Sequence, residues 1–136
     1  MKKLPIKIIL PFVVTVISLS IPQFSLATDD ICILGSSAVN MTVREADKFF
    51  EDKLDGFHVT GTGKVLRVVQ QGTEGTNENV TIDAECSNGV RLVLHVDTFW
   101  VNRNNAKEGS MLRFSGRSVR LKKHGSKVTC IVEVTN

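Results

Sequence analysis

The sequence predicts a mainly β protein, a small barrel of five strands preceded by one amphipathic α-helix. Three observations lead to this fold class. Apolar residues recur at helical spacing before Gly56, and at a period of two in the segments after it. The first of these segments is long and contains glycines, and a polar interruption separates the third from the fourth. This pattern suits a closed barrel, because closure removes the exposed edges that a flat sheet would leave.

The predicted helix begins at a capping box, in which Thr42 accepts a hydrogen bond from the Glu45 amide and Glu45 reaches back to the Thr42 amide. Apolar side chains then fall on one face over about three turns, and Asp55-Gly56 ends the helix. That face consists of Val43, Ala46, Phe49, Phe50 and Leu54. We interpret it as core packing, with the acidic side chains in solvent.

The five strands are expected at residues 57–69, 80–86, 90–96, 111–121 and 127–134. Gly61 and Gly63 in the first strand, and Gly116 in the fourth, predict bulges or bends. A three-residue loop with Gly89 in the left-handed conformation keeps the apolar residues of strands two and three on one face, whereas a two-residue Asn-Gly turn would mix the faces. Residues 70–79 predict a mobile polar loop, and residues 102–109 a short helix or turn.

The N-terminus has the order of a secretory signal: three lysines, an apolar run over residues 8–21, and Ser25-Leu26-Ala27. A membrane anchor is the alternative, but this run is shorter than the ~20 residues that a spanning helix needs. We therefore expect a signal peptide over residues 1–27, an N-terminal extension over 28–41, and a helix-plus-barrel domain over 42–136. The mature protein is expected to be periplasmic or secreted, with no membrane span after cleavage.

Charge is distributed unevenly along the chain. Lys2, Lys3 and Lys7 are three of the 17 basic residues, so the mature chain has 14 basic against 14 acidic residues. Residues 28–90 contain 5 basic and 11 acidic residues, whereas residues 91–127 contain 9 basic and 2 acidic residues. The sequence therefore predicts an electrically polar molecule with a basic second half.

The three cysteines are Cys32, Cys86 and Cys130. Export would place them where disulfides persist, and three cysteines allow one bridge and leave one thiol. Cys86 and Cys130 both fall on the apolar side of their predicted strands, which favours a bridge between them. A bridge from Cys32 to Cys130 is the chief alternative, because sequence alone cannot show whether two Cα atoms lie within ~7 Å.

Four segments resemble the bacterial OB-fold (BOF-like) family of periplasmic proteins and, more distantly, exported OB-fold domains described as tRNA-anticodon-domain-like. These segments are residues 42–46 (TVREA), 59–65 (VTGTGKV), 96–100 (VDTFW) and 113–117 (RFSGR). The resemblance covers residues 42–134 and implies a periplasmic OB-fold barrel. It also implies an association with the envelope or with stress tolerance, and binding of small ligands or envelope components.

One constellation stands out as a candidate ligand site. Six basic residues lie within residues 113–127, a span that contains no Asp or Glu: Arg113, Arg117, Arg120, Lys122, Lys123 and Lys127. Such crowding fits anion recognition near the hairpin that joins strands four and five, and an ordinary solvated surface is the alternative. Trp100 is a weaker candidate for a stacking contact, since an aromatic residue ending strand three more often plugs a barrel.

The sequence contains no catalytic signature, and His58, His95 and His124 lack the spacing of a metal site. We therefore expect no enzyme activity, no metal and no cofactor. The favoured function is a binding module for an anionic small molecule, glycan or envelope component. Two alternatives are a single-stranded nucleic-acid binder and a subunit that docks another envelope protein. Export and the absence of tyrosine argue against nucleic acid.

Overall fold

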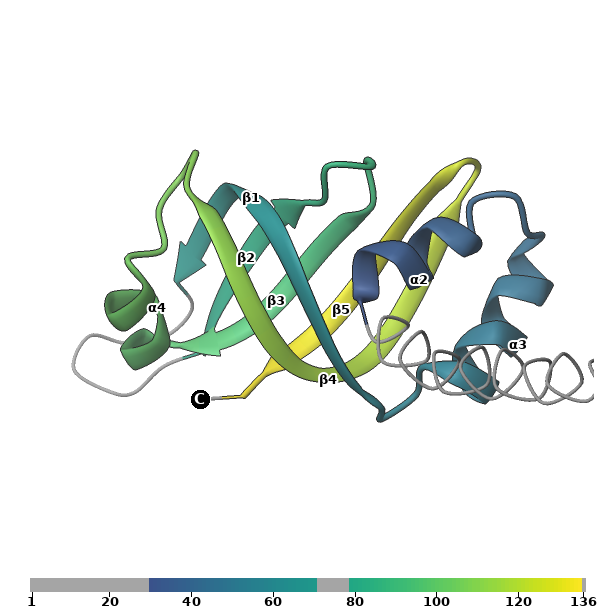
Figure 1. The fold of residues 1–136 in the computed structure, drawn as a ribbon, viewed down its shortest axis with the longest axis horizontal. Helices are drawn as coiled ribbons and strands as arrows, with labels where there is room; N and C mark the ends of the chain where they lie inside the picture. Colours follow the sequence, from purple (N-terminus) through teal and green to yellow (C-terminus); the bar gives the residue numbers. More distant parts are fainter. Residues whose placement is uncertain (1–29, 71–78, 136) are drawn as a thin grey trace, which may run out of the picture.

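The computed structural model describes residues 30–70 and 79–135, which form a closed five-stranded barrel with helices around it (Figure 1). The predicted signal peptide and residues 71–78 of the predicted loop lie outside the described residues. The elements are α2 (Ile31–Ser37), α3 (Val43–Lys53), β1 (His58–Gln70), β2 (Asn79–Glu85), β3 (Arg91–Asp97), α4 (Thr98–Asn104), β4 (Met111–His124) and β5 (Lys127–Val134).

The strand order around the barrel is β1-β2-β3-β5-β4, and β4 closes the ring by pairing with β1. Only β3 and β5 pair in parallel among these neighbours. A crossover connection is needed between β3 and β5, and α4 lies in that part of the chain. The predicted fold class, a mainly β OB-fold-like barrel preceded by an amphipathic helix, is confirmed.

The predicted capping box and the β2–β3 hairpin are confirmed, but the predicted core face of the helix is only partly right: Ala46 and Leu54 are buried, Phe49 and Phe50 are half-buried, and Val43 is 56% exposed at the first turn. α3 carries the complete capping box of Thr42 and Glu45. In the hairpin, Ala84 pairs with Leu92, the Cys86 amide donates to the Val90 carbonyl, and Gly89 has a φ of 90°. The three-residue loop therefore keeps the apolar residues of both strands inside the barrel.

The predicted bulges lie elsewhere. The β1 register is unbroken at Gly61 and Gly63 and shifts between Val65 and Arg67 instead. A Cβ atom at Gly61 would lie 2.6 Å from the Phe114 ring and 2.8 Å from Ile31, so this glycine makes room for core side chains. In β4 the shift falls between Ser118 and Arg120 rather than at Gly116.

β4 is long enough to serve two partners in turn. Residues 111–117 pair with β1, and residues 116–124 pair with β5. In its second half, β4 has no strand partner on the edge that pairs with β1 in the first half. The turn after α3 binds this edge at its start: the Gly56 amide donates to the Ser118 carbonyl, and the Ser118 amide donates to the Phe57 carbonyl. α3 packs against β4 here and buries Ala46 and Leu54. The helix and the turn after it thus protect an edge that would otherwise be exposed.

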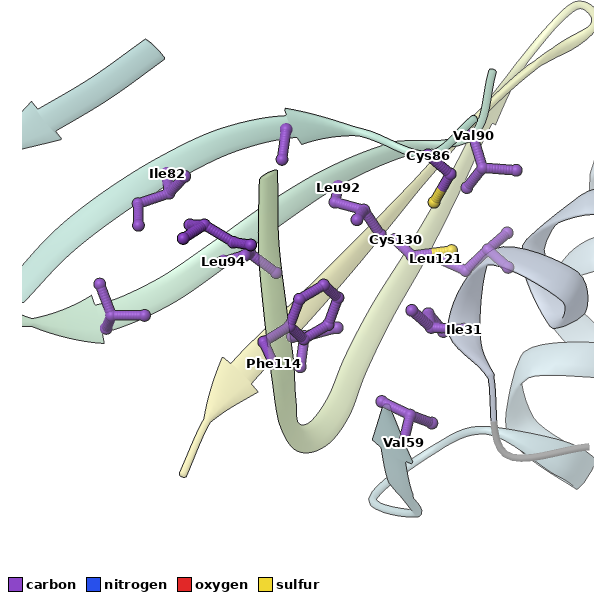
Figure 2. Packing of buried hydrophobic residues seen from close by; sticks show 14 of the residues in the cluster. Ile31, Val59, Ile82, Cys86, Val90, Leu92, Leu94, Phe114, Leu121 and Cys130 are labelled. Carbon is purple, nitrogen blue, oxygen red and sulfur yellow. The ribbon is translucent and has the colours of Figure 1, made fainter. Parts of the chain in front are cut away.

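One end of the barrel is closed by α2, a helix that the sequence reading did not predict. Asp30 caps it by accepting from the Cys32 amide at 2.8 Å. Ile31 is fully buried and points from α2 into the core (Figure 2). A Cβ atom at Gly35 would lie 2.8 Å from Val90 and 3.1 Å from the Cys130 sulfur, so the helix needs glycine to approach this closely.

A disulfide joins Cys32 of α2 to Cys86, with a Cα–Cα distance of 5.9 Å. The predicted Cys86–Cys130 bridge is therefore wrong, and so is its Cys32–Cys130 alternative. The physical reason is the sheet order: β3 lies between β2 and β5, which puts Cys86 and Cys130 two strand spacings of about 4.8 Å apart. Cys130 remains a free, buried thiol.

The other end of the barrel is closed by α4, which contacts β2 and β3. Asp97 caps this helix by accepting from the Trp100 amide at 2.8 Å. Trp100 is only 4% exposed and belongs to the core. The helix begins at Thr98, four residues before the stretch in which we expected it, and ends at Asn105 in the left-handed conformation.

Candidate functional site

The structure does not gather the six predicted site residues into one patch. Arg113 lies in the half of β4 that pairs with β1, with Thr62 as its cross-strand partner. Lys122 lies in the other half, opposite Thr129 of β5. Because β4 changes partner between them, a run of basic residues in the sequence becomes two separate surfaces on the barrel.

Two of the six basic side chains already have partners. Arg117 forms an ion pair with Glu133 on the neighbouring strand, with 3.2 Å between nitrogen and oxygen. Lys123 is half-buried and donates from Nζ to the Val39 carbonyl at 2.9 Å and to the Gly125 carbonyl. Lys123 therefore ties the α2–α3 connection to the hairpin, which gives it a structural role.

Three basic side chains remain exposed around the β4–β5 hairpin: Arg120, Lys122 and Lys127. We call them the hairpin surface. Within the described part of the chain, none of the three has an ion pair or a hydrogen bond through its side chain. Their partners by register are the half-buried Ile131 for Arg120, the half-buried Thr129 for Lys122, and the exposed His124 for Lys127. On the hairpin surface, unpaired positive charges therefore lie beside an apolar side chain and a hydroxyl group.

The charge of Arg120 is partly offset by α3. A shallow groove between α3 and β4 is lined by Asp47, Phe50, Glu51, Asp55, Val119, Arg120 and Leu121. No carboxylate of this groove lies within ion-pair distance of Arg120, but three of them share its surroundings. The strongest unbalanced positive charge on the hairpin surface thus belongs to Lys122 and Lys127.

The outer face of β2 and β3 has a different character, because its charges are paired across strands. Arg67 binds Asp83 with 2.8 Å between nitrogen and oxygen, and Arg91 binds Glu85 at 3.0 Å. All four side chains are partly or fully exposed, so each pair adds little stability. These pairs leave little net charge for an anionic ligand on this face.

Trp100 does not reach the surface, in agreement with the interpretation of this residue as a plug for the barrel. The exposed aromatic of α4 is instead Phe99, which is 68% exposed. Phe99 lines an apolar hollow together with Thr98, Asn102 and Arg103. The sequence reading missed Phe99, since two adjacent aromatics give no signal of which one a short helix will turn inward.

Lys64 is a second residue that the sequence reading missed. It is exposed on β1, and its β4 partner is Met111, one outward position from Arg113. In the sequence, the nearest basic residue to Lys64 is Arg67, which is paired with Asp83. Lys64 joins Arg113 only through the β1–β4 pairing, which no local pattern specifies.

Titratable groups that chemistry could use are scarce. Across residues 30–70 and 79–135, no three histidine, cysteine or carboxylate side chains are arranged to hold a metal ion. His58, His95 and His124 lie on three different strands. Burial raises the pKa of the Cys130 thiol to about 12, so this group is protonated at neutral pH and is a poor nucleophile.

No helix within the described ranges is long and apolar enough to cross a membrane. Neither a protein-family model nor a curated protein matches this sequence. Among solved structures, the barrel is similar to that of a lipoprotein from Klebsiella pneumoniae that is proposed to bind nucleic acid. The two share 12% identity with a TM-score of 0.48, over 65% of this chain and 77% of the other. The class of protein defined by the fold is an OB-fold-like barrel with both ends closed by helices.

Proposed function

We propose that this protein is an exported OB-fold-like binding module that captures an anionic small molecule, glycan or envelope component. The observation that carries the proposal is the hairpin surface, where Arg120, Lys122 and Lys127 form no ion pair among the described residues and only the charge of Arg120 is partly offset by nearby carboxylates. Like charges in such proximity repel one another, and a bound anion relieves that repulsion. The protein acts by binding and not by catalysis, in the periplasm or outside the cell.

Three observations support export and an envelope role. The N-terminal residues have the charge and hydropathy order of a signal peptide. The Cys32–Cys86 disulfide belongs to the bonds that persist in oxidising compartments. The resemblance to periplasmic OB-fold proteins adds the envelope and stress association. We therefore place the ligand among the anionic molecules that an exported protein meets.

The experiment is retention on immobilised heparin, a sulfated glycan, by the protein lacking residues 1–27. Replacing Lys122 and Lys127 together by Ala should lower the salt concentration of elution. Binding of this variant displaces fewer counter-ions from the heparin, because two cations have been removed. The matched control is Lys48→Ala with Lys53→Ala, which removes the same charge from α3. Equal elution of the two double variants would show that net charge, and not the hairpin surface, governs retention.

A second candidate function is single-stranded nucleic-acid binding, favoured by one observation. Phe99 presents an exposed ring beside Arg103, and base stacking on such rings contributes about 1 to 3 kcal/mol per base. Fluorescence anisotropy with oligo-dT would test it: Phe99→Ala should weaken binding several-fold while heparin retention stays unchanged. Docking to another envelope protein is the third function, and co-purification from envelope extracts would reveal it.

A further inference from the structure

The paired halves of β1 and β4 present an outer surface that contains no carboxylate. Its outward residues are His58, Thr60, Thr62 and Lys64 of β1 and Met111, Arg113, Ser115 and Arg117 of β4, here called the β1–β4 face. Figure 1 shows these two strands running on the near side of the barrel, with α2 and α3 to the right of them. All eight side chains except the half-buried Ser115 are exposed.

The carboxylates that border this face are each bound elsewhere. Asp30 bridges to Thr60 at the other edge of β1, but its side chain caps α2. Glu85 is the β2 partner of Lys64, yet it forms an ion pair with Arg91 at 3.0 Å.

At the opposite end of the face, Glu133 is paired with Arg117. Lys64 and Arg113 therefore have no counter-ion among the described residues, although three carboxylates lie around the face. Their charges are free to meet an anion from solution.

The face is long and narrow. It spans seven residues of each strand, which at about 3.3 Å per residue gives a strip roughly 20 Å long and two strands wide. Lys64 and Arg113 lie at one end of the strip, and the hydroxyl groups of Thr62, Thr60 and Ser115 continue from them toward Arg117. Hydroxyls with Lys and Arg are the side chains that contact phosphate oxygens. A single phosphate would use one part of this strip, whereas a chain of phosphates would contact all of it.

The residue types also indicate what the occupant lacks. None of the eight positions carries Phe, Tyr or Trp, so the face offers no platform on which bases could stack. Recognition must come from charge and hydroxyl donors alone. These features fit a polymer whose repeating unit is itself the anionic group.

We propose that the β1–β4 face binds a linear polymer of phosphate groups, with Lys64 and Arg113 supplying the charge and Thr60, Thr62 and Ser115 supplying hydroxyl donors. This surface is distinct from the hairpin surface, because it lies on the half of β4 that pairs with β1. The protein would thus have two separate anion-binding surfaces, the hairpin surface and the β1–β4 face.

The test is isothermal titration of the protein lacking residues 1–27 with short-chain inorganic polyphosphate. Lys64→Ala with Arg113→Ala should weaken binding by about tenfold or more at low salt, because two cations that contact phosphate groups are lost. The slope of log K against log salt should fall in magnitude by about 1.4, because each phosphate contact of a single-stranded polyanion contributes about 0.7. Orthophosphate should bind at least about a hundredfold more weakly than the polymer.

Two controls separate this proposal from the function proposed above. Lys122→Ala with Lys127→Ala removes the same charge from the hairpin surface and should leave polyphosphate affinity within about twofold, while it lowers heparin retention. Polyphosphate binding that is absent, insensitive to Lys64 and Arg113, or equally sensitive to both variants would overturn the proposal. So would tighter binding of oligo-dT than of polyphosphate through the same two residues. An unchanged melting temperature in each variant confirms that the fold is intact.

Discussion

The two ends of the barrel are closed by helices of the same length that are held in different ways. α4 follows β3 directly in the chain, and its main anchor is the buried Trp100. α2 precedes the whole barrel and is held by Ile31, by the disulfide to Cys86, and by polar contacts from Asn88 and Lys123. A short helix has little stability of its own, so each cap depends on its anchors. The helix from outside the strand sequence is thus joined to the barrel by a covalent bond as well as by packing, whereas the helix within it contributes its own buried aromatic anchor.

The largest expected effect is at the α4 end. Trp100→Ala should lower the free energy of unfolding by about 3 to 5 kcal/mol, because it removes the side chain that fills this end of the barrel. Urea unfolding followed by circular dichroism measures the loss. The neighbouring Phe99→Ala is the control, since Phe99 is mostly exposed and its removal should cost little. Similar losses in both variants would mean that Trp100 does not anchor the cap.

The next largest effect is at the α2 end. Replacing Cys32 and Cys86 together by Ala should cost about 2 to 4 kcal/mol, because the bond closes a loop across a sequence separation of 54 residues. Hydrogen exchange should show that α2 opens early in this variant. The amides of α4 should stay protected up to the limit set by the variant's lower global stability. Equal loss of protection at both ends would contradict the idea that the two caps are anchored separately.

A smaller effect is expected from the polar tie between the hairpin and the α2–α3 connection. Lys123→Met should cost about 1 to 2 kcal/mol, since it removes a charged donor from the Val39 carbonyl. Lys122→Met is the matched control, because Lys122 is exposed and makes no such contact; its cost should be about 0.5 kcal/mol or less. Thermal melts of the two variants measure the difference. Equal melting temperatures would contradict the structural role assigned to Lys123.

The smallest change is expected from thiol reagents on the native protein. Cys130 is buried beside Gly35 of α2 with its pKa raised to about 12, so electrophilic reagents that require a thiolate nucleophile should label it very slowly at pH 8. The raised pKa also means that the contribution of this thiol to stability is complete below pH 9 and declines as pH rises from about 9 to 12. Removing the Cys32–Cys86 bond should speed labelling. Rapid labelling of the intact protein, read by mass spectrometry, would show that α2 does not seal this end.

The barrel could be predicted because its signals are local. Alternating apolar residues, the Thr42 capping box and the register of the Gly89 loop each depend on a few adjacent residues, and each is found as expected. α2 could not be predicted, because it is a seven-residue segment with an internal glycine and forms through contacts with residues far along the chain. The disulfide prediction was wrong for a related reason. Two residues that both face the core are not neighbours when another strand lies between their strands.

The candidate site was predictable in composition and not in arrangement. The basic character of residues 113–127 is real, but a strand that changes partner divides it, and cross-strand carboxylates neutralise part of it. Arg117 shows the limit most clearly, since its partner Glu133 is 16 residues away in the sequence. Which cations stay unpaired depends on the sheet order, and that information is spread over the whole domain.

The pairing of the cysteines has a consequence for how the chain is made. The native bond joins the first two cysteines in N-to-C order, and the third follows 44 positions after the second. A chain that enters an oxidising compartment N-terminus first presents Cys32 and Cys86 before Cys130, so the native pair can form before the competing thiol arrives. A fully reduced chain refolded from denaturant has no such order to guide it, and must choose among three pairings. Arrival of the cysteines in that order favours the native bond over the two pairings that involve Cys130, whereas refolding from denaturant gives no such preference.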